Sequence, residues 1–127
     1  MPTNLIQHIE WTTRNTARLK KFYGAIFDWQ FATRTDDYTM IEGIGGIYAA
    51  PDTKMPVGIT PYVNVANLEQ TEKAIKKAGG TVVLSNQPVA GMGRFSMFTD
   101  PDGNLMAIWE AQMTQKPKAK RRAAKKK

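Results

Sequence analysis

One pattern of predicted elements, a strand, a helix and three further strands, runs through the chain twice. In the first half, residues 5–13 are rich in β-branched and aromatic types, which favours a strand. Asn15 is a good N-cap for the helix that follows, and apolar residues at helical spacing give this helix one stripe. The stripe consists of Leu19, Phe22, Tyr23, Ile26 and Phe27, and the three further strands are predicted near 29–34, 38–42 and 45–50.

The second half repeats this order after a linker at 52–56. Residues 59–65 predict a strand, and Asn67 with Gln70 resembles the capping box of a helix start. Gly79-Gly80 ends that helix, as C-terminal glycines do. The predicted buried stripe of the helix consists of Thr71, Ala74, Ile75 and Ala78. Three strands are predicted after it, near 81–85, 93–99 and 105–110. The last two strands are joined by the turn sequence Asp100-Pro101-Asp102-Gly103-Asn104.

These patterns predict an α+β domain at 1–113, built from two βαβββ modules at about 4–51 and 58–112.

The rest of the chain, 114–127, is a basic tail: residues 116–127 hold eight cations and no acid, whereas the other residues hold 10 basic and 11 acidic side chains. A segment with so little apolar surface is expected to be disordered. Such a tail favours weak, sequence-independent binding of nucleic acid by Lys116–Lys127; the alternative is a solubilising extension with no biological partner.

The composition excludes several classes of protein. The chain has no Cys, so disulfides and thiolate metal sites are excluded. No apolar run approaches the roughly 18 residues of a membrane span, and the first residues lack the pattern of a signal peptide. A soluble cytoplasmic protein without a membrane partner is expected.

The alternation of side chains places polar residues on one face of each leading strand. His8, Glu10 and Thr12 share a face of the first strand, and Ile9 and Trp11 lie opposite. In the strand at 59–65 the polar face carries Thr60, Tyr62 and Asn64, and the opposite face carries Val63 and Val65. A sheet with helices on one face and polar groups on the other predicts a cleft or wet cavity.

Several of these segments resemble a known family. The start, with His8-Ile9-Glu10, Phe22-Tyr23-Gly24 and Phe27-Asp28-Trp29, is similar to the first module of vicinal-oxygen-chelate domains, the glyoxalase/bleomycin-resistance-like family. Gly79-Gly80 and the closing segment 98–104 match the second module. The resemblance covers about 4–112 and implies two modules with curved sheets around a cleft. It leaves the reaction open, because the family includes glyoxalases, dioxygenases, epimerases, thiol transferases and metal-free drug-binding proteins.

The resemblance also implies where a metal would be bound. The metal enzymes of the family take one ligand from each of four strands, and in this chain the first position holds His8. The third and fourth hold Thr60 and Ala107, and no acid stands in 46–49, where the second is expected. Glu42 is a poor substitute, because it lies on the preceding strand. The sequence therefore predicts no metal site and no other cofactor.

The remaining candidates for chemistry are few. His8 and Glu10 are the candidate catalytic pair, because a His–carboxylate pair can act as a general base; the alternative is a structural polar pair. Candidates for ligand binding are Thr60, Tyr62, Asn64, Arg94 and Trp109, since aromatic walls with a few polar groups are typical of small-molecule pockets. The alternative for Tyr62, Asn64 and Trp109 is that they fill the cleft or a dimer interface. Arg94 follows Gly91-Met92-Gly93 and is either a clamp for an anion or a surface residue of a hairpin. Glu110 is expected to be solvated.

Three functions follow as hypotheses. The first is a metal-independent protein that binds a small organic ligand. The second is a lyase or isomerase of the lactoylglutathione-lyase-like kind, which uses His8 and Glu10 or a metal. The third is a nucleic-acid-associated protein that binds through the tail. A homodimer is expected, because related domains pair modules across a two-fold axis and two such modules expose sheet edges.

Overall fold

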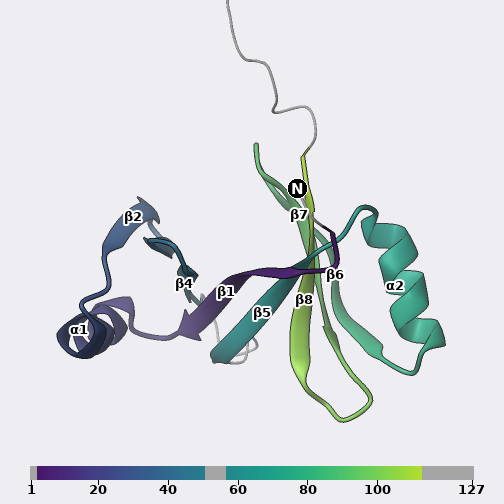
Figure 1. The fold of residues 1–127 in the computed structure, drawn as a ribbon, viewed down its shortest axis with the longest axis horizontal. Coiled ribbons are helices and arrows are strands. Elements are labelled where there is room, and N and C mark those ends of the chain that lie inside the picture. Colours follow the sequence, from purple (N-terminus) through teal and green to yellow (C-terminus); the bar gives the residue numbers. More distant parts are fainter. Residues whose placement is uncertain (1–2, 51–56, 113–127) are drawn as a thin grey trace, which may run out of the picture. The chain divides into compact units, whose positions relative to one another are not determined.

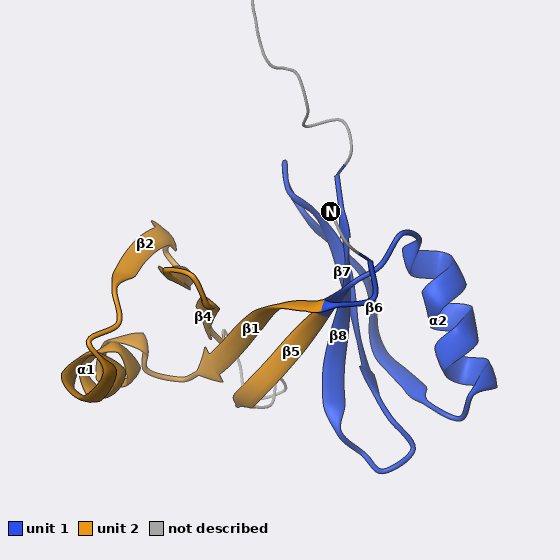
Figure 2. Cartoon of the chain, in the orientation of Figure 1, with its two compact units in different colours: residues 1–5, 63–127 blue, residues 6–62 orange. Residues whose placement is uncertain are grey.

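The computed structural model describes residues 3–50 and 57–112; the predicted linker at 52–56 and tail at 114–127 lie outside these ranges. The described part holds eight strands and two helices, in the order that the sequence predicts. The chain divides into two compact units (Figure 2), an N-terminal unit of residues 6–62 and a C-terminal unit of residues 1–5 and 63–127. The division falls inside the strand β5 (Gly58–Asn64) and not in the linker.

The N-terminal unit is a small mixed sheet with one helix. Its strands follow the order β2-β3-β4-β1, in which β1 and β4 are parallel and the other neighbours antiparallel. The register joins Glu10 to Gly46 and Thr12 to Tyr48 across β1 and β4. The elements are β1 (Ile6–Thr13), α1 (Thr16–Phe27), β2 (Phe31–Thr35), β3 (Tyr38–Ile41), β4 (Gly45–Ala49) and the first residues of β5.

The helix α1 begins where the sequence predicts. The side chain of Asn15 accepts a hydrogen bond from the backbone N–H of Arg18, which satisfies one of the free donors of the first turn. The helix ends at Asp28, whose backbone is left-handed with φ 59°. Trp11 of β1 packs edge-on against Tyr23 of α1 and against Trp29, so this face of β1 is aromatic, as the alternation predicts.

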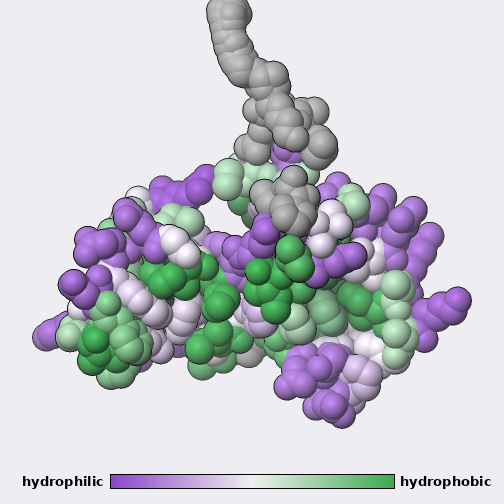
Figure 3. All heavy atoms as spheres, in the orientation of Figure 1, coloured by the Kyte–Doolittle hydropathy of each residue, from purple (hydrophilic) through white to green (hydrophobic). Residues whose placement is uncertain are grey.

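The apolar stripe of α1 is less buried than a core-facing stripe would be. No residue of α1 is fully buried, and Phe22, Ile26 and Phe27 are each more than half exposed. Figure 3 shows hydrophobic residues at the surface in the region of α1, at the lower left. The twelve-residue helix bears more apolar side chains than its own sheet covers.

The C-terminal unit is an antiparallel sheet with α2 along one face (Figure 1). Its strands follow the order β8-β7-β6 through consecutive hairpins. Val65, Leu68 and Ile108 form the buried core cluster, and Val63, Ile75 and Phe98 pack against it, which confirms that Val63 and Val65 face the helix. The elements are α2 (Leu68–Lys77), β6 (Thr81–Val89), β7 (Gly93–Thr99) and β8 (Leu105–Ala111).

The ends of α2 lie where the sequence predicts them, but the residues that the helix buries differ from the predicted stripe. The Asn67 side chain accepts from the Gln70 N–H, and Gly79 follows the helix with φ 101°. The predicted stripe is wrong at Ala74 and Ala78, which are exposed, since the helix rests on the sheet chiefly through Leu68 and Ile75.

The turn at 100–104 forms as predicted. The Asp100 carboxylate accepts hydrogen bonds from the backbone N–H groups of Asp102 and Asn104, and Gly103 has φ 91°. Neither helix of the described part is long and apolar enough to cross a membrane.

Candidate functional site

The polar face of β1 gathers a buried cluster in the N-terminal unit. Glu10 is only 7% exposed, and its carboxylate accepts a hydrogen bond of 3.1 Å from the hydroxyl of Tyr62 on β5. Tyr38, on β3, lies near enough to lower the pKa of Glu10. No cation pairs with this carboxylate in the described part of the chain. Three strands therefore bring together one acid and two phenols, and we name Glu10, Tyr38, Tyr62 and His8 the polar cluster.

The environment of Glu10 makes its charged form costly. Burial raises the pKa of Glu10 to about 6, and the hydrogen bond from Tyr62, together with the nearby Tyr38, only partly offsets this effect. Burial, followed by the negative charge of Glu10, raises the pKa of Tyr38 and of Tyr62 far above the ordinary phenol value. Near neutral pH the site thus holds one carboxylate close to its titration range and two neutral phenols.

His8 lies at the edge of this cluster. Its Nε2 is 2.7 Å from the Tyr38 hydroxyl, and its ring stacks on Tyr38 and meets the edge of Tyr62. Burial lowers the pKa of His8 below its ordinary value, so the imidazole is neutral at pH 7. The hydrogen bond of the His8 ring is to Tyr38, and that of the Glu10 carboxylate is from Tyr62.

Gly46 makes the position of Tyr38 possible. A Cβ at this position would lie 2.2 Å from the Tyr38 hydroxyl oxygen and 2.3 Å from the adjoining ring carbon. Only glycine leaves room for the phenol over β4. Tyr48 pairs with Tyr38 across β3 and β4 and lies on the same face. The sequence did not single out Tyr38, although its alternation with Met40 in the predicted strand was a signal of the same kind.

Two cavities are present in the N-terminal unit. One of about 350 Å³ is lined by residues 6–9 of β1, which include His8, and by Gly43 and Ile44, which precede β4. The other, of about 390 Å³, lies beside Trp11 and Tyr23 and is lined also by Arg14 and Arg18. The first reaches the polar cluster through His8. Thr60, which is 3% exposed, shares the face of Tyr62 on β5 by alternation.

The other three predicted ligand-binding residues belong to the C-terminal unit and do not share one face there. Arg94 and Glu110 pair across β7 and β8 and both face α2, whereas Trp109, next to Glu110, lies on the opposite face. Asn64 precedes Val65, which packs toward α2, so by alternation its side chain also lies opposite α2. The structure therefore places Arg94 apart from Asn64 and Trp109.

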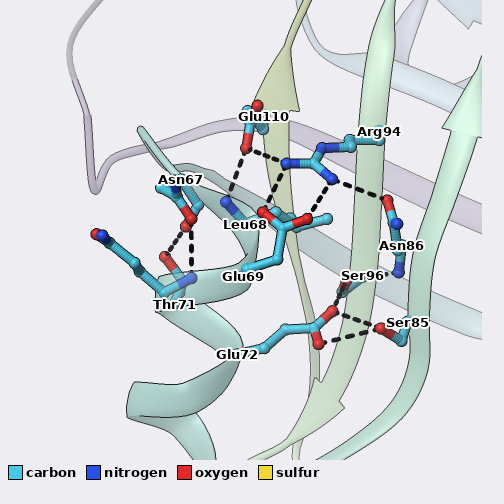
Figure 4. A network of polar contacts seen from close by, with 11 residues as sticks. Asn67, Leu68, Glu69, Thr71, Glu72, Ser85, Asn86, Arg94, Ser96 and Glu110 are labelled. Carbon is cyan, nitrogen blue, oxygen red and sulfur yellow. Dashed lines mark hydrogen bonds and ion pairs between the residues drawn. The ribbon is translucent and has the colours of Figure 1, made fainter.

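Arg94 is engaged by acids of its own unit (Figure 4). Its guanidinium donates to both carboxylate oxygens of Glu69, at 2.5 and 2.7 Å, and to Glu110 at 3.0 Å. It also donates to the side chain of Asn86. The arginine holds the pKa of the exposed Glu69 below its usual range. This arrangement fastens α2 to the sheet.

The expectation that Glu110 is solvated is wrong. Its side chain is 26% exposed, and its carboxylate accepts a 2.7 Å hydrogen bond from the backbone N–H of Leu68 at the start of α2. A carboxylate at a helix N-terminus satisfies a free donor and interacts favourably with the helix dipole. The residue lies within β8, on the face of the sheet that α2 covers.

The donors of the polar face do not fit a catalytic metal of the family type. Besides His8 and Glu10, the face carries phenols and Thr60, and Gly46 and Tyr48 occupy the face positions of β4. Residues 3–50 and 57–112 contain no group of three or more His, Asp or Glu side chains that could hold an ion. Ala107, at the fourth expected position, is fully buried and has no donor side chain. Imidazole and carboxylate ligands from several strands are what such a metal needs.

Comparison with known proteins identifies the family. The model of the Glyoxalase/Bleomycin resistance protein/Dioxygenase superfamily matches residues 5–108. The chain belongs to this superfamily, and its eight strands and two helices form the α+β glyoxalase-like fold.

The curated relatives are distant and longer. "Putative glyoxylase CFP32" of Mycobacterium tuberculosis is 25% identical over 121 residues, covering 81% of this chain and 44% of the relative. "Anthracycline biosynthesis protein DauV" of a Streptomyces species is 28% identical over 110 residues, covering 69% of this chain and 40% of the relative. The chain thus spans less than half the length of these proteins.

Solved structures agree on the fold. The Mn(II)-bound glyoxalase from Novosphingobium aromaticivorans matches with a TM-score of 0.61 at 14% identity, over 85% of this chain and 39% of that one. At this identity the likeness concerns the fold alone.

Proposed function

We propose that the protein binds a small organic ligand without a metal, at the cavity beside His8 and the polar cluster behind it. The observation that carries this proposal is the carboxylate of Glu10, which is buried among phenols and has no cationic partner in the described residues. Burying a charge in this way is costly. Perturbed, buried acids gather at functional sites more often than elsewhere.

The ligand that suits this site is an uncharged molecule with hydrogen-bonding oxygens or nitrogens. The cluster offers hydroxyl donors from Tyr38 and Tyr62, an imidazole and a carboxylate, and aromatic rings for stacking. Stacking and a few directed hydrogen bonds are typical of small-molecule sites. One relative is named as an anthracycline biosynthesis protein, and an aromatic ligand would suit the rings of this cluster.

Turnover of the ligand is the second candidate function, and the pKa of Glu10 favours it. A carboxylate with a pKa of about 6 is a suitable general base near neutral pH, and His8 is neutral and able to accept a proton. A lyase or isomerase that moves a proton next to a carbonyl would need no more than such a pair. Under this hypothesis the protein would carry out a glyoxalase-like lyase or isomerase reaction without a metal.

Native mass spectrometry of the freshly purified full chain tests the binding proposal. We expect an organic adduct, which decreases in Tyr62→Phe and His8→Ala and persists in Tyr23→Phe, a tyrosine on the aromatic face of β1. One equivalent of divalent metal that is held by the wild type and lost in His8→Ala would contradict the metal-free proposal.

Two further proposals concern partners. A homodimer, proposed from the exposed apolar residues of α1, should give twice the chain mass in light scattering.

Weak nucleic-acid binding is proposed from the eight cations at 116–127. The logarithm of its affinity should fall with the logarithm of the salt concentration, at a slope on the order of −5 to −7. Truncation after Met113 should abolish that binding; if the binding survives, the folded residues carry it instead.

A further inference from the structure

We propose that the N-terminal unit has a second ligand site, separate from the polar cluster, which binds a small aromatic anion such as a carboxylate. The site is the cavity of about 390 Å³ beside Trp11 and Tyr23. By alternation along β1, Trp11 lies on the face opposite to His8 and Glu10. The proposal therefore does not depend on the proposed function, and either of the two can fail without the other.

Most of the wall of this cavity is aromatic or aliphatic. The rings of Trp11 and Tyr23 meet edge to face with centroids 5.8 Å apart, and Leu19 of α1 lines the cavity as well. Val57, which precedes β5, and Ile59 of β5 complete the apolar wall and are 57% and 56% exposed. An aromatic ring bound here can remove aliphatic surface from water, which stabilises the complex.

The charged residues that line the cavity are all cations. Arg14 and Arg18 belong to the lining, and no Asp or Glu does. In the ranges that the structure describes, no carboxylate pairs with Arg18. A guanidinium can hold a carboxylate through two parallel hydrogen bonds. The cavity therefore combines an apolar wall with positive charge, and this combination selects an anion with an apolar body.

The stability of α1 does not account for the two arginines. They lie on either side of the N-cap residue Asn15, and the first turn of the helix contains no acid. Cations at this end of a helix interact unfavourably with the helix dipole, whereas anions interact favourably. A bound anion would offset the cost of Arg14 and Arg18, which the helix alone leaves uncompensated.

Tyr23 adds a neutral hydrogen-bond donor to the cavity. Its hydroxyl oxygen accepts a hydrogen bond of 3.3 Å from the indole N–H of Trp11, and the hydroxyl proton has no acceptor among the residues described. The hydroxyl of Thr13, by contrast, is already hydrogen-bonded to the backbone of Asn15. Tyr23 can therefore donate to a ligand oxygen without giving up its bond from Trp11.

An NMR titration of the full-length chain with cinnamate, an aromatic carboxylate, tests the proposal. The chain has three Trp, and the indole N–H signal of Trp11 is identified as the one that disappears in Trp11→Phe. We expect a saturable shift of this signal, with Trp109, which does not line the cavity, as the internal reference. Uncharged cinnamamide has the same ring and should bind roughly fivefold more weakly or worse, because it cannot form charge-assisted hydrogen bonds.

Substitutions of the lining separate this site from general attraction of an anion. Arg18→Gln should weaken cinnamate binding by roughly fivefold or more, the equivalent of one hydrogen bond, and leave cinnamamide binding unchanged. Tyr23→Phe should weaken cinnamate binding by a smaller factor. Lys21→Gln is the matched control, because it removes the same charge from an exposed position of α1 outside the cavity, and it should have no effect.

Three results would overturn the proposal. The first is the absence of a saturable shift of Trp11, and the second is an equal loss of affinity in Lys21→Gln and Arg18→Gln. The third is a loss of cinnamate binding in His8→Ala, which would place the probe at the polar cluster instead. Cinnamate binding at Trp11 without any organic adduct in native mass spectrometry would contradict the proposed function alone and support this second site.

Discussion

The two units place carboxylates in opposite circumstances. Glu10 of the N-terminal unit is buried among phenols without a cation, and burial raises its pKa to about 6. Glu69 of the C-terminal unit is exposed and bound by Arg94, which lowers its pKa. Ionisation of a glutamate side chain is thus disfavoured at Glu10 in one unit and favoured at Glu69 in the other.

This difference between the carboxylates distinguishes a structural hydrogen-bond network in the C-terminal unit from a candidate functional site in the N-terminal unit. In the C-terminal unit every carboxylate of the network ties α2 to the strands: Glu72 accepts from Ser85 and Ser96, and Glu110 accepts from the backbone of Leu68 (Figure 4). In the N-terminal unit no helix is held by Glu10, whose carboxylate accepts a hydrogen bond from Tyr62 on the neighbouring strand β5. An acid that costs free energy without anchoring an element is the better candidate for function.

The largest expected effect is that of filling the space under Tyr38. Gly46→Ala should lower the free energy of unfolding by about 1–3 kcal/mol, because the new methyl group overlaps the phenol. Urea denaturation measures this. In a Tyr38→Ala background the same change should cost much less, since the overlapping ring is gone; an equal cost in both backgrounds would place the strain elsewhere.

Glu10→Gln should stabilise the protein at neutral pH. Because the pKa of Glu10 is raised from 4.5 to about 6, its contribution to stability is full below pH 4.5 and is lost as pH rises through 6. The difference corresponds to about 2 kcal/mol. Urea unfolding at pH 4 and pH 8 should show the variant gaining this amount relative to wild type only at the higher pH. A loss of stability at pH 8 would mean that the carboxylate is paired after all.

In the C-terminal unit, Ser96→Ala should destabilise by about 1–2 kcal/mol. Ser96 is fully buried, donates to Glu72 and accepts from the backbone N–H of Asn86. Ser85→Ala is the matched control, because Ser85 also donates to Glu72 but is exposed, and it should cost less than about 0.5 kcal/mol. Thermal unfolding distinguishes the two; equal costs would show that burial does not matter in this network.

The smallest expected effect is that of Arg94→Gln. The guanidinium binds two carboxylates, but Glu69 is 55% exposed, so solvent screens the pair and the loss should stay below about 1 kcal/mol. In about 1 M salt the difference from wild type should shrink further, because screening weakens such pairs. A cost that is large and independent of salt would make this ion pair, and not the apolar contacts of Leu68, the main anchor of α2.

How far the sequence could predict the site depends on how local each feature is. The alternation within β1 was sufficient to place His8 and Glu10 on one face, and the turn at 100–104 follows from its own residues. Tyr38 could not be found in this way, because its contact with His8 depends on the register of β3 against β4. The partners of Arg94 depend likewise on how α2 lies on β7.

The same limit explains the errors in burial. Helical spacing identifies which residues of α1 and α2 share a stripe, but not how wide the covering sheet is. Ala74 and Ala78 are exposed because Leu68 and Ile75 make the contact, and Phe22 is exposed because its own sheet does not reach it. The fold class could be predicted from pattern and resemblance together; the width of each packing face required the structure.

The pairing of β1 with β4 also has a consequence for how the chain reaches its fold. Ile9 pairs with Gly45 only after the whole of α1, β2 and β3 has been placed between them, whereas β6, β7 and β8 join through short hairpins. Closing a long loop costs entropy before the strand contact can stabilise the chain, and folding rates fall as contacts become less local in the sequence. The hairpins around Ser96 should therefore form early in refolding, and the chain should acquire the surroundings of Glu10 last.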